Sequence, residues 1–258
     1  MREALREVGF IAWRSTRRTV RQPALIVPSI VFPLVLLAVN SGGLGEATKI
    51  PGFPADSYLD FALTVTFMQG ALFAAVTAGT GLATDIETGF LDRLQLTPLR
   101  PYAVLAGQLA GAATLSMISI TTYIAVGLIA GASIKAGVAG VAVLFVLALL
   151  VAVAFAGIGM IMAARTGQAE AVQGLFPLLF VTLFLSSMSF PRPLIAVDWF
   201  RTIATYNPVS YLVEGMRSLV ITGWDGAALA KGFAFALGIA LLSWVLAARA
   251  LRTRMART

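Results

Sequence analysis

The sequence predicts an all-α integral membrane protein with six transmembrane helices, an N-terminal interfacial amphipathic helix and a short outer re-entrant helix region before the last span. Of its 258 residues, 59% are hydrophobic and only 12% are charged, which leaves more apolar surface than a soluble domain can bury. The apolar residues form runs long enough to cross a hydrocarbon core of about 30 Å. The charged residues gather between these runs. Together these observations indicate a single membrane domain over residues 1–258.

Residues 1–22 are predicted to form the interfacial helix. Its apolar face would carry Ala4, Leu5, Val8, Ile11 and Ala12, and its polar face would carry Glu7, Arg14, Arg17, Arg18 and Arg21. Such a helix lies in the headgroup layer with its arginines on anionic lipid, and Trp13 suits that depth. A solvated basic leader is the alternative. The arginines also interrupt the region where the apolar core of a cleavable signal peptide would lie.

The six spans are predicted at about residues 24–40, 59–83, 102–130, 138–164, 170–188 and 229–248. Pro28 and Pro33 should kink the first span. Five glycines in the third and fourth spans should let helix backbones approach closely, namely Gly107, Gly111, Gly127, Gly131 and Gly157. An even number of spans places both termini on one side of the membrane. Most of the nineteen Lys and Arg residues then fall on that side, which predicts cytoplasmic termini, a cytoplasmic segment 85–101 and an outer segment 189–228.

The segment 85–101 is the most polar stretch between two long apolar runs. Phe90, Leu91 and Leu94 alternate with charges as in a short amphipathic helix, and the prolines at 98 and 101 end it. A loop that only satisfies topology has no need for apolar residues exposed to water. The pattern therefore favours a knob that docks into a groove on a partner protein. A plain charged loop is the alternative.

In the outer segment 189–228, Asn207 and Pro208 form a typical helix cap and first position. Apolar residues then recur at helical spacing, at Val209, Leu212, Val213, Met216 and Leu219. This predicts a short amphipathic helix that dips into the membrane face or a partner surface.

Several functional classes are excluded or disfavoured. The chain has no His and no Cys, so no site built on those residues is expected, and no metal site is predicted. It lacks a phosphate-binding loop, and its basic residues do not form a nucleic-acid patch. The ionisable residues near the spans, Asp60, Asp85, Glu170 and Lys231, lie near predicted ends, which disfavours an ion-coupled transporter. No span pairs two carboxylates, which disfavours an intramembrane enzyme.

The segments ETGFLDRLQLTPLRP and YNPVSYLVEGMR, with the turn at 187–191 between them, occur in an order that resembles the permease subunit of an ABC-2-type exporter of the antibiotic- and lipid-exporting branch. The resemblance implies that 85–101 is a coupling loop that docks on a separate ATP-binding subunit. The predicted coupling residues are Asp85, Glu87, Gly89, Leu91, Arg93, Leu94, Thr97, Pro98 and Arg100. Those predicted for the outer re-entrant helix are Asn207, Pro208, Tyr211, Glu214 and Arg217. Gln108 departs from the pattern, since many members carry lysine there, and this leaves the subfamily open.

The resemblance also implies an assembly of two permease subunits, identical or paralogous, with two ATP-binding subunits in the plasma membrane of a prokaryote. No cofactor is expected in this chain, because ATP and Mg would be bound by the partner. The second and fifth spans would line a path for an amphipathic drug, natural product or lipid, in contact with membrane lipids. The candidate path residues are Phe67, Gln69, Gln173, Phe176, Phe180 and Phe184; ordinary packing or lipid-facing phenylalanine is the alternative. Polysaccharide or sodium-ion export, or a non-transporting anchor for an ATPase, are the alternative functions.

Overall fold

The computed structural model describes residues 2–95 and 101–256, and every regular element in these ranges is a helix. Five helices are long and apolar enough to cross a membrane: α2 (Pro23–Gly43), α3 (Tyr58–Glu87), α5 (Pro101–Ile129), α6 (Gly137–Thr166) and α11 (Gly226–Met255). They correspond to the predicted spans one to four and six, and most extend a few residues beyond the predicted ends. The N-terminal helix α1 (Arg2–Val20) precedes them.

Helix α3 is the central element of the bundle. Its most apolar stretch is 89% buried, against 17% for α2 and 28% for α11. Phe61, Leu63 and Leu82 on α3 are fully enclosed by the surrounding helices. Side chains on every face of α3 therefore meet protein rather than lipid, and the helices that line the functional site are positioned against it.

Small residues allow the closest helix contacts. Gly79 on α3 and Gly159 on α6 lie where the two helices meet, and a Cβ at Gly159 would overlap the carbonyl oxygen of Ala75. Gly157 faces Ser243 of α11, whose hydroxyl donates to the carbonyl of Ala154 at 3.0 Å. The predicted packing role holds for Gly107, Gly111, Gly127 and Gly157, each of which has side chains of a neighbouring helix against it. It is wrong for Gly131, which has a φ of +96° in the turn after α5 and where a Cβ would meet no atom of another helix within 4 Å.

The fifth predicted span is interrupted. It consists of α7 (Ala169–Gln173) and α8 (Leu175–Phe184), which meet at Gly174. Pro177 explains the break, because it has no N–H to donate to the carbonyl of Gln173 and its ring crowds that carbonyl. The two pieces are together shorter than the five long helices, so a sixth crossing stays a prediction. In α2, by contrast, the helix is continuous through Pro28 and Pro33.

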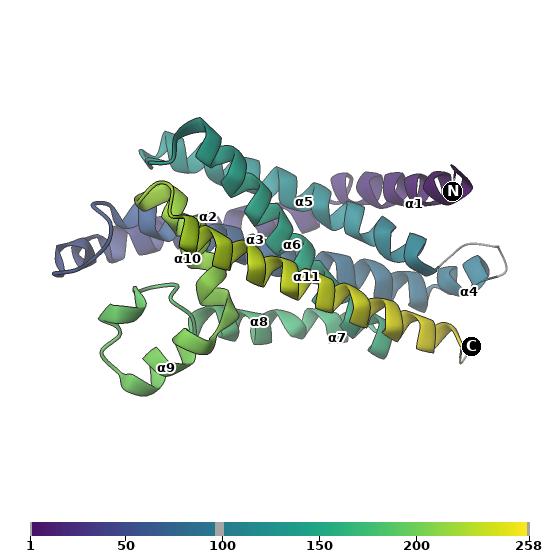
Figure 1. Ribbon diagram of the computed structural model, residues 1–258. Coiled ribbons are helices and arrows are strands. Elements are labelled where there is room, and N and C mark those ends of the chain that lie inside the picture. The colour runs from purple at the N-terminus through teal and green to yellow at the C-terminus, as the bar shows by residue number, and fades with distance from the viewer. Residues whose placement is uncertain (1, 96–100, 257–258) are drawn as a thin grey trace.

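The two ends of the bundle differ. Both described chain ends lie at the same end of the molecule as the short helix α4 (Phe90–Gln95), as Figure 1 shows. The opposite end carries the short 3₁₀ helices η1 (Gly45–Lys49) and η2 (Arg192–Leu194) with α9 (Asp198–Tyr206) and α10 (Pro208–Ile221). There Asp60, at the start of α3, accepts hydrogen bonds from the backbone N–H and hydroxyl of Ser133, at 2.9 and 2.8 Å. These bonds tie α3 to the turn between α5 and α6.

Candidate functional site

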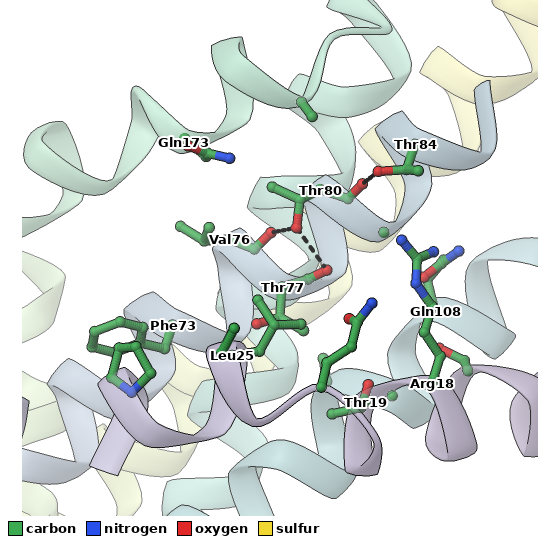
Figure 2. A pocket seen from close by; sticks show the side chains of 18 of the residues that line it. Arg18, Thr19, Leu25, Phe73, Val76, Thr77, Thr80, Thr84, Gln108 and Gln173 are labelled. Carbon is green, nitrogen blue, oxygen red and sulfur yellow. Dashed lines mark hydrogen bonds between the residues drawn. The ribbon is translucent and has the colours of Figure 1, made fainter. Parts of the chain in front are cut away.

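A cavity of about 580 Å³ lies among α1, α2, α3, α5 and the α7–α8 pair. Figure 2 shows it from close by, with side chains of all these elements except α8 labelled around it. Its lining has two chemically different regions. The apolar region includes Leu25, Pro28, Phe32, Phe73, Val76 and Phe176, and the polar region includes Ser15, Arg18, Thr19, Gln22, Thr77, Thr80, Thr84, Gln108 and Gln173.

Aromatic rings form the apolar region. The ring of Phe73 on α3 lies 6.1 Å from that of Phe32 on α2 and 5.1 Å from that of Phe176 on α8, centroid to centroid. Phe180 extends the cluster, 5.7 Å from both Phe32 and Phe176. Rings from three separate helices thus make one apolar wall, which suits a flat or branched hydrophobic group.

Threonines on one face of α3 form much of the polar region. The hydroxyl of Thr80 donates to the carbonyls of Val76 and Thr77, and that of Thr84 donates to the carbonyl of Thr80 at 2.8 Å (Figure 2). These bonds use the hydroxyl hydrogens but leave oxygen lone pairs facing the cavity, so the threonines act as acceptors. The amides of Gln22 and Gln173 add donors and acceptors on two other elements.

Asp85 does not line the cavity but binds two residues of its polar region, Arg18 and Gln108. Its carboxylate is buried and accepts from Arg14 Nη2 at 3.1 Å and from Gln108 Nε2 at 2.6 Å, while Arg18 Nη1 lies 3.7 Å away. The Arg14 guanidinium also lies 4.0 Å from the centre of the Phe90 ring on α4. We refer to Asp85, Arg14, Arg18 and Gln108 as the Asp85 cluster. It joins α1, α3 and α5, and because it contains two arginines and one acid it leaves one net positive charge beside the cavity.

The structure corrects two sequence-based interpretations here. Asp85 and Glu87 are not loop residues, because α3 continues through Glu87. Among residues 8–20, the part of α1 whose side chains the structure describes, the buried residues are Ile11, Ser15 and Thr19, whereas Val8 and Ala12 are half-buried. The predicted Ala4 and Leu5 lie outside the described side chains. Gly107 and Gly111 on α5 allow the buried face of α1 to pack closely. Phe10 and Trp13, on the other side of α1, are exposed.

The remaining coupling candidates that the structure describes lie in α4 or in the turn before it. Gly89 adopts a φ of +66° at the turn before α4, which is the conformation glycine tolerates best. Leu91 is buried and Arg93 is exposed. Leu94 lies within α4. Thr97, Pro98 and Arg100 lie outside the described residues.

Glu87 contacts a different helix from the one that carries it. Its Oε1 accepts a hydrogen bond of 2.7 Å from the backbone N–H of Ala169, at the start of α7. The end of α3 next to α4 is therefore linked directly to the helix pair that forms one wall of the cavity.

Of the candidate path residues, only Gln173 and Phe176 line the cavity. Phe180 belongs to the aromatic cluster beside it, and Phe184 is half-exposed at the end of α8. Phe67 is buried elsewhere, 5.9 Å from the ring of Tyr123, and Gln69 lines a separate void of about 10 Å³. The candidate path residues of α3 and those of α7 and α8 therefore do not line the same cavity within one chain. A role for any of these residues in binding stays a prediction.

The outer helix begins as the sequence predicts. Asn207 caps α10, accepting from the N–H of Val209 at 2.9 Å, and Pro208 is its first residue. The Asn207 amide also donates to the carbonyls of Thr182 and Leu185 at 2.7 and 3.0 Å, which fixes the end of α8. The Tyr211 hydroxyl donates to the carbonyl of Thr205 at 2.9 Å.

Glu214 and Arg217 lie on the same helix but bind different groups. Glu214 pairs with both Nε and Nη2 of Arg192. Burial acts to lower the pKa of Arg192, but the hydrogen bonds and charges of Glu214 and Tyr211 together outweigh it and raise that pKa overall. Arg217 is buried and donates to three backbone carbonyls, at Phe61, Ser187 and Met188.

Sequence reasoning missed Arg14, Arg18 and Arg192 as partners of the buried or half-buried acids. The spacing of four between Arg14 and Arg18 was a usable signal, because it places both on one face of α1. Nothing in the sequence indicates which acid that face meets. Within the described ranges, no three His, Cys, Asp or Glu side chains gather as a metal site would require.

Comparison with known proteins gives a consistent result. The sequence model of the family described as "ABC-2 type transporter" matches residues 6–221. A protein of Porphyra purpurea named as the transport permease ycf38 is 26% identical over 86% of this chain and 77% of its own length. A Mycobacterium tuberculosis protein named as the doxorubicin resistance ABC transporter permease DrrC is 22% identical over 81% of this chain and 75% of its own length. The ycf38 protein of Pyropia yezoensis is 27% identical over 83% of this chain and 74% of its own length.

Proposed function

Because the chain belongs to the ABC-2 type transporter family, we propose that it is the membrane permease subunit of an ATP-driven exporter for an amphipathic small molecule. The observation that carries this proposal is the cavity, whose wall is aromatic on one side and rich in hydroxyls and amides on the other. Its volume of about 580 Å³ lies within the range typical of small-molecule sites.

The lining selects for a compound with both an apolar body and a polar group. Phe32, Phe73 and Phe176 offer a surface for rings or alkyl chains. The threonine face of α3 and the side chains of Gln22, Gln108 and Gln173 offer hydrogen-bond donors and acceptors. Arg18 adds a positive charge that Asp85 balances only in part, because Asp85 also pairs with Arg14. Such a cargo reaches the cavity from the headgroup layer, where α1 lies in the proposed orientation.

Motion at the α4 end has a direct route to the cavity. Helix α3 carries both Glu87, next to α4, and the cavity-lining residues from Phe73 to Thr84. Glu87 holds the start of α7, and Asp85 holds α1 and α5. An ATP-binding subunit docked at α4 and residues 96–100 would therefore move three cavity walls together when it closes on ATP. The contact with such a subunit is part of the proposal.

The test is transport by the complete assembly. We would co-express the chain with a candidate ATP-binding subunit, reconstitute the complex in liposomes and measure ATP-dependent transport of doxorubicin, a fluorescent probe suggested by the DrrC relative. Thr80→Phe fills the cavity with a side chain and should reduce transport by about tenfold or more, equivalent to about 1.4 kcal/mol in binding.

Thr121→Phe is the matched control. Thr121 also donates its hydroxyl to its own helix, to the carbonyl of Met117 at 2.8 Å, but it faces outward from α5 and does not line the cavity. It should transport as the parent does. Equal transport by both variants would contradict the cavity as the cargo site. ATP hydrolysis by a stable complex with no transport of any amphiphile would instead favour an anchoring role.

A further inference from the structure

A second cavity, of about 590 Å³, lies at the end of the molecule opposite α4. Its lining includes Glu214, Arg217 and Ser218 of α10, Thr222 directly after that helix, Arg192 of η2, Arg201 of α9, and Asp225 before α11. None of these residues lines the cavity described above. We call this second space the outer cavity.

Most charges around the outer cavity are already matched. Glu214 binds Arg192 through two hydrogen bonds. Arg201 pairs with Asp198. Asp225 caps α11, accepting from the N–H groups of Ala227 and Ala228 at 3.0 Å each. The charges of the two ion pairs cancel, and the N-terminus of α11 stabilises the remaining negative charge of Asp225.

Arg217 is the exception. It is only 6% exposed, yet no ion pair links it to a carboxylate among the described residues. Glu214 precedes it by three positions on α10, a spacing that commonly gives an ion pair, but the Glu214 carboxylate engages Arg192 instead. A buried positive charge without a counter-charge is energetically unfavourable.

Three backbone carbonyls satisfy part of Arg217. Its Nε donates to the carbonyl of Phe61 at 3.3 Å, Nη1 to that of Ser187 at 2.9 Å and Nη2 to that of Met188 at 3.0 Å. A guanidinium has five N–H groups, so one on each Nη remains for a further acceptor. The Phe61 ring also lies over the guanidinium, with its centre 3.5 Å from the guanidinium carbon, and the charge of Glu214 acts on Arg217 without a direct contact. These contacts account for the position of Arg217, but among the described residues no carboxylate binds its two remaining N–H groups beside the cavity.

We propose that the outer cavity binds an anionic oxygen-bearing group, of the phosphate or phosphomonoester class, through the two free Nη N–H groups of Arg217. A guanidinium binds such groups with two parallel hydrogen bonds. The hydroxyls of Ser218 and Thr222 lie on the same wall, and their oxygens can accept from a protonated phosphate oxygen or a headgroup hydroxyl. This inference concerns binding alone and does not depend on which cargo the cavity of the candidate functional site binds.

The test measures binding to the purified full chain in an uncharged detergent at constant ionic strength. The probes are dihexanoyl phosphatidic acid, inorganic phosphate and zwitterionic dihexanoyl phosphatidylcholine, titrated by calorimetry. We expect phosphatidic acid to bind about tenfold more tightly than phosphatidylcholine. Equal binding of inorganic phosphate identifies a free anion as sufficient, and weaker binding identifies a lipid headgroup; both support the site. Indistinguishable binding of all three probes would overturn it.

Two variants locate the site. Arg217→Gln should weaken phosphatidic acid binding by about tenfold. Because Arg217 also holds three carbonyls, this variant could fail to fold, and Glu214→Gln provides an independent arm. It removes a negative charge and frees Arg192, so it should tighten binding by about threefold or more, whereas loss of a merely structural ion pair would not.

Glu170→Gln is the matched control for charge. Glu170 is exposed on α7 at the other end of the molecule, and the substitution changes the net charge by the same amount. It should leave the affinity unchanged. Equal effects of Glu214→Gln and Glu170→Gln, or full affinity in a folded Arg217→Gln, would overturn the assignment.

Discussion

Asp85 holds three helices together because its buried carboxylate on α3 accepts from Arg14 on α1 and from Gln108 on α5. The bond to Gln108 is short, at 2.6 Å, and an amide donor there leaves the charge of Asp85 to be balanced by α1 alone. Because glutamine carries no charge, the opposite charges near Asp85 come from Arg14 and Arg18 of α1, which ties this helix to the bundle.

Replacing Asp85 with asparagine should destabilise the protein. The change removes the charge that Arg14 and Arg18 share, although solvent stabilises both arginines in part because their side chains are 38% and 33% exposed. We expect a loss of about 1 to 3 kcal/mol, seen as a lower midpoint of thermal unfolding in detergent. Asp198→Asn is the control, since that aspartate is 86% exposed and also pairs with an arginine. Equal shifts for the two variants would argue against the Asp85 cluster.

The sequence placed Asp85 in an exposed loop, and the reason for the error is physical. Charged residues after a long apolar run usually mark the end of a span, and nothing local shows that α3 continues to Glu87, four residues beyond the predicted end. The partner that makes burial possible, Arg14, is 71 positions away. Residue types at a helix end were therefore predictable, but their burial depended on a tertiary contact.

At the scale of elements, the sequence predicted best those helix ends that carry a capping residue, a proline or a glycine. Asn207 and Pro208 begin α10 as predicted, and the predicted amphipathic segment after Gly89 forms α4. The α7–α8 break was less visible, since an apolar run containing Pro177 is compatible with a kink or with two helices, and α2 remains continuous through two prolines. The cavity could not be predicted, because it depends on the relative placement of five elements.

The crossing of α3 and α6 gives a sharp test at this scale. A side chain at Gly159 would overlap the backbone of Ala75, which cannot move without displacing α3. Gly159→Ala should therefore lower stability by about 1 to 3 kcal/mol. Gly238→Ala is the control, because Gly238 on α11 has nothing within 4 Å and alanine should favour the helix by about 0.5 to 1 kcal/mol. Both would be compared by equilibrium unfolding in mixed micelles; equal effects would contradict the close crossing.

For the whole molecule, the bundle encloses α3 and exposes apolar faces on α2, α8 and α11. Helix α2 exposes Val27, Val31, Val35 and Val39 in a row at a spacing of four. Helix α8 exposes Leu178, Val181 and Phe184. Both helices also line the cavity of the candidate functional site. In the proposed exporter, the exposed faces of α2 and α8 contact a second permease subunit. A path shared by two subunits must run beside the helices that line the cavity.

Cysteine crosslinking can test that arrangement cleanly, because the chain contains no cysteine and each introduced one is unique. In a two-fold interface, residues near the axis meet their own copies, so some single substitutions along the α2 row should form disulfide-linked dimers. We expect Val31→Cys or Val35→Cys to crosslink in native membranes under mild oxidation, as judged by non-reducing electrophoresis. Leu241→Cys, equally apolar and 68% exposed on α11, should remain largely monomeric. Dimers only through Leu241→Cys would place the second subunit on α11, away from the cavity, and would exclude a path shared along α2.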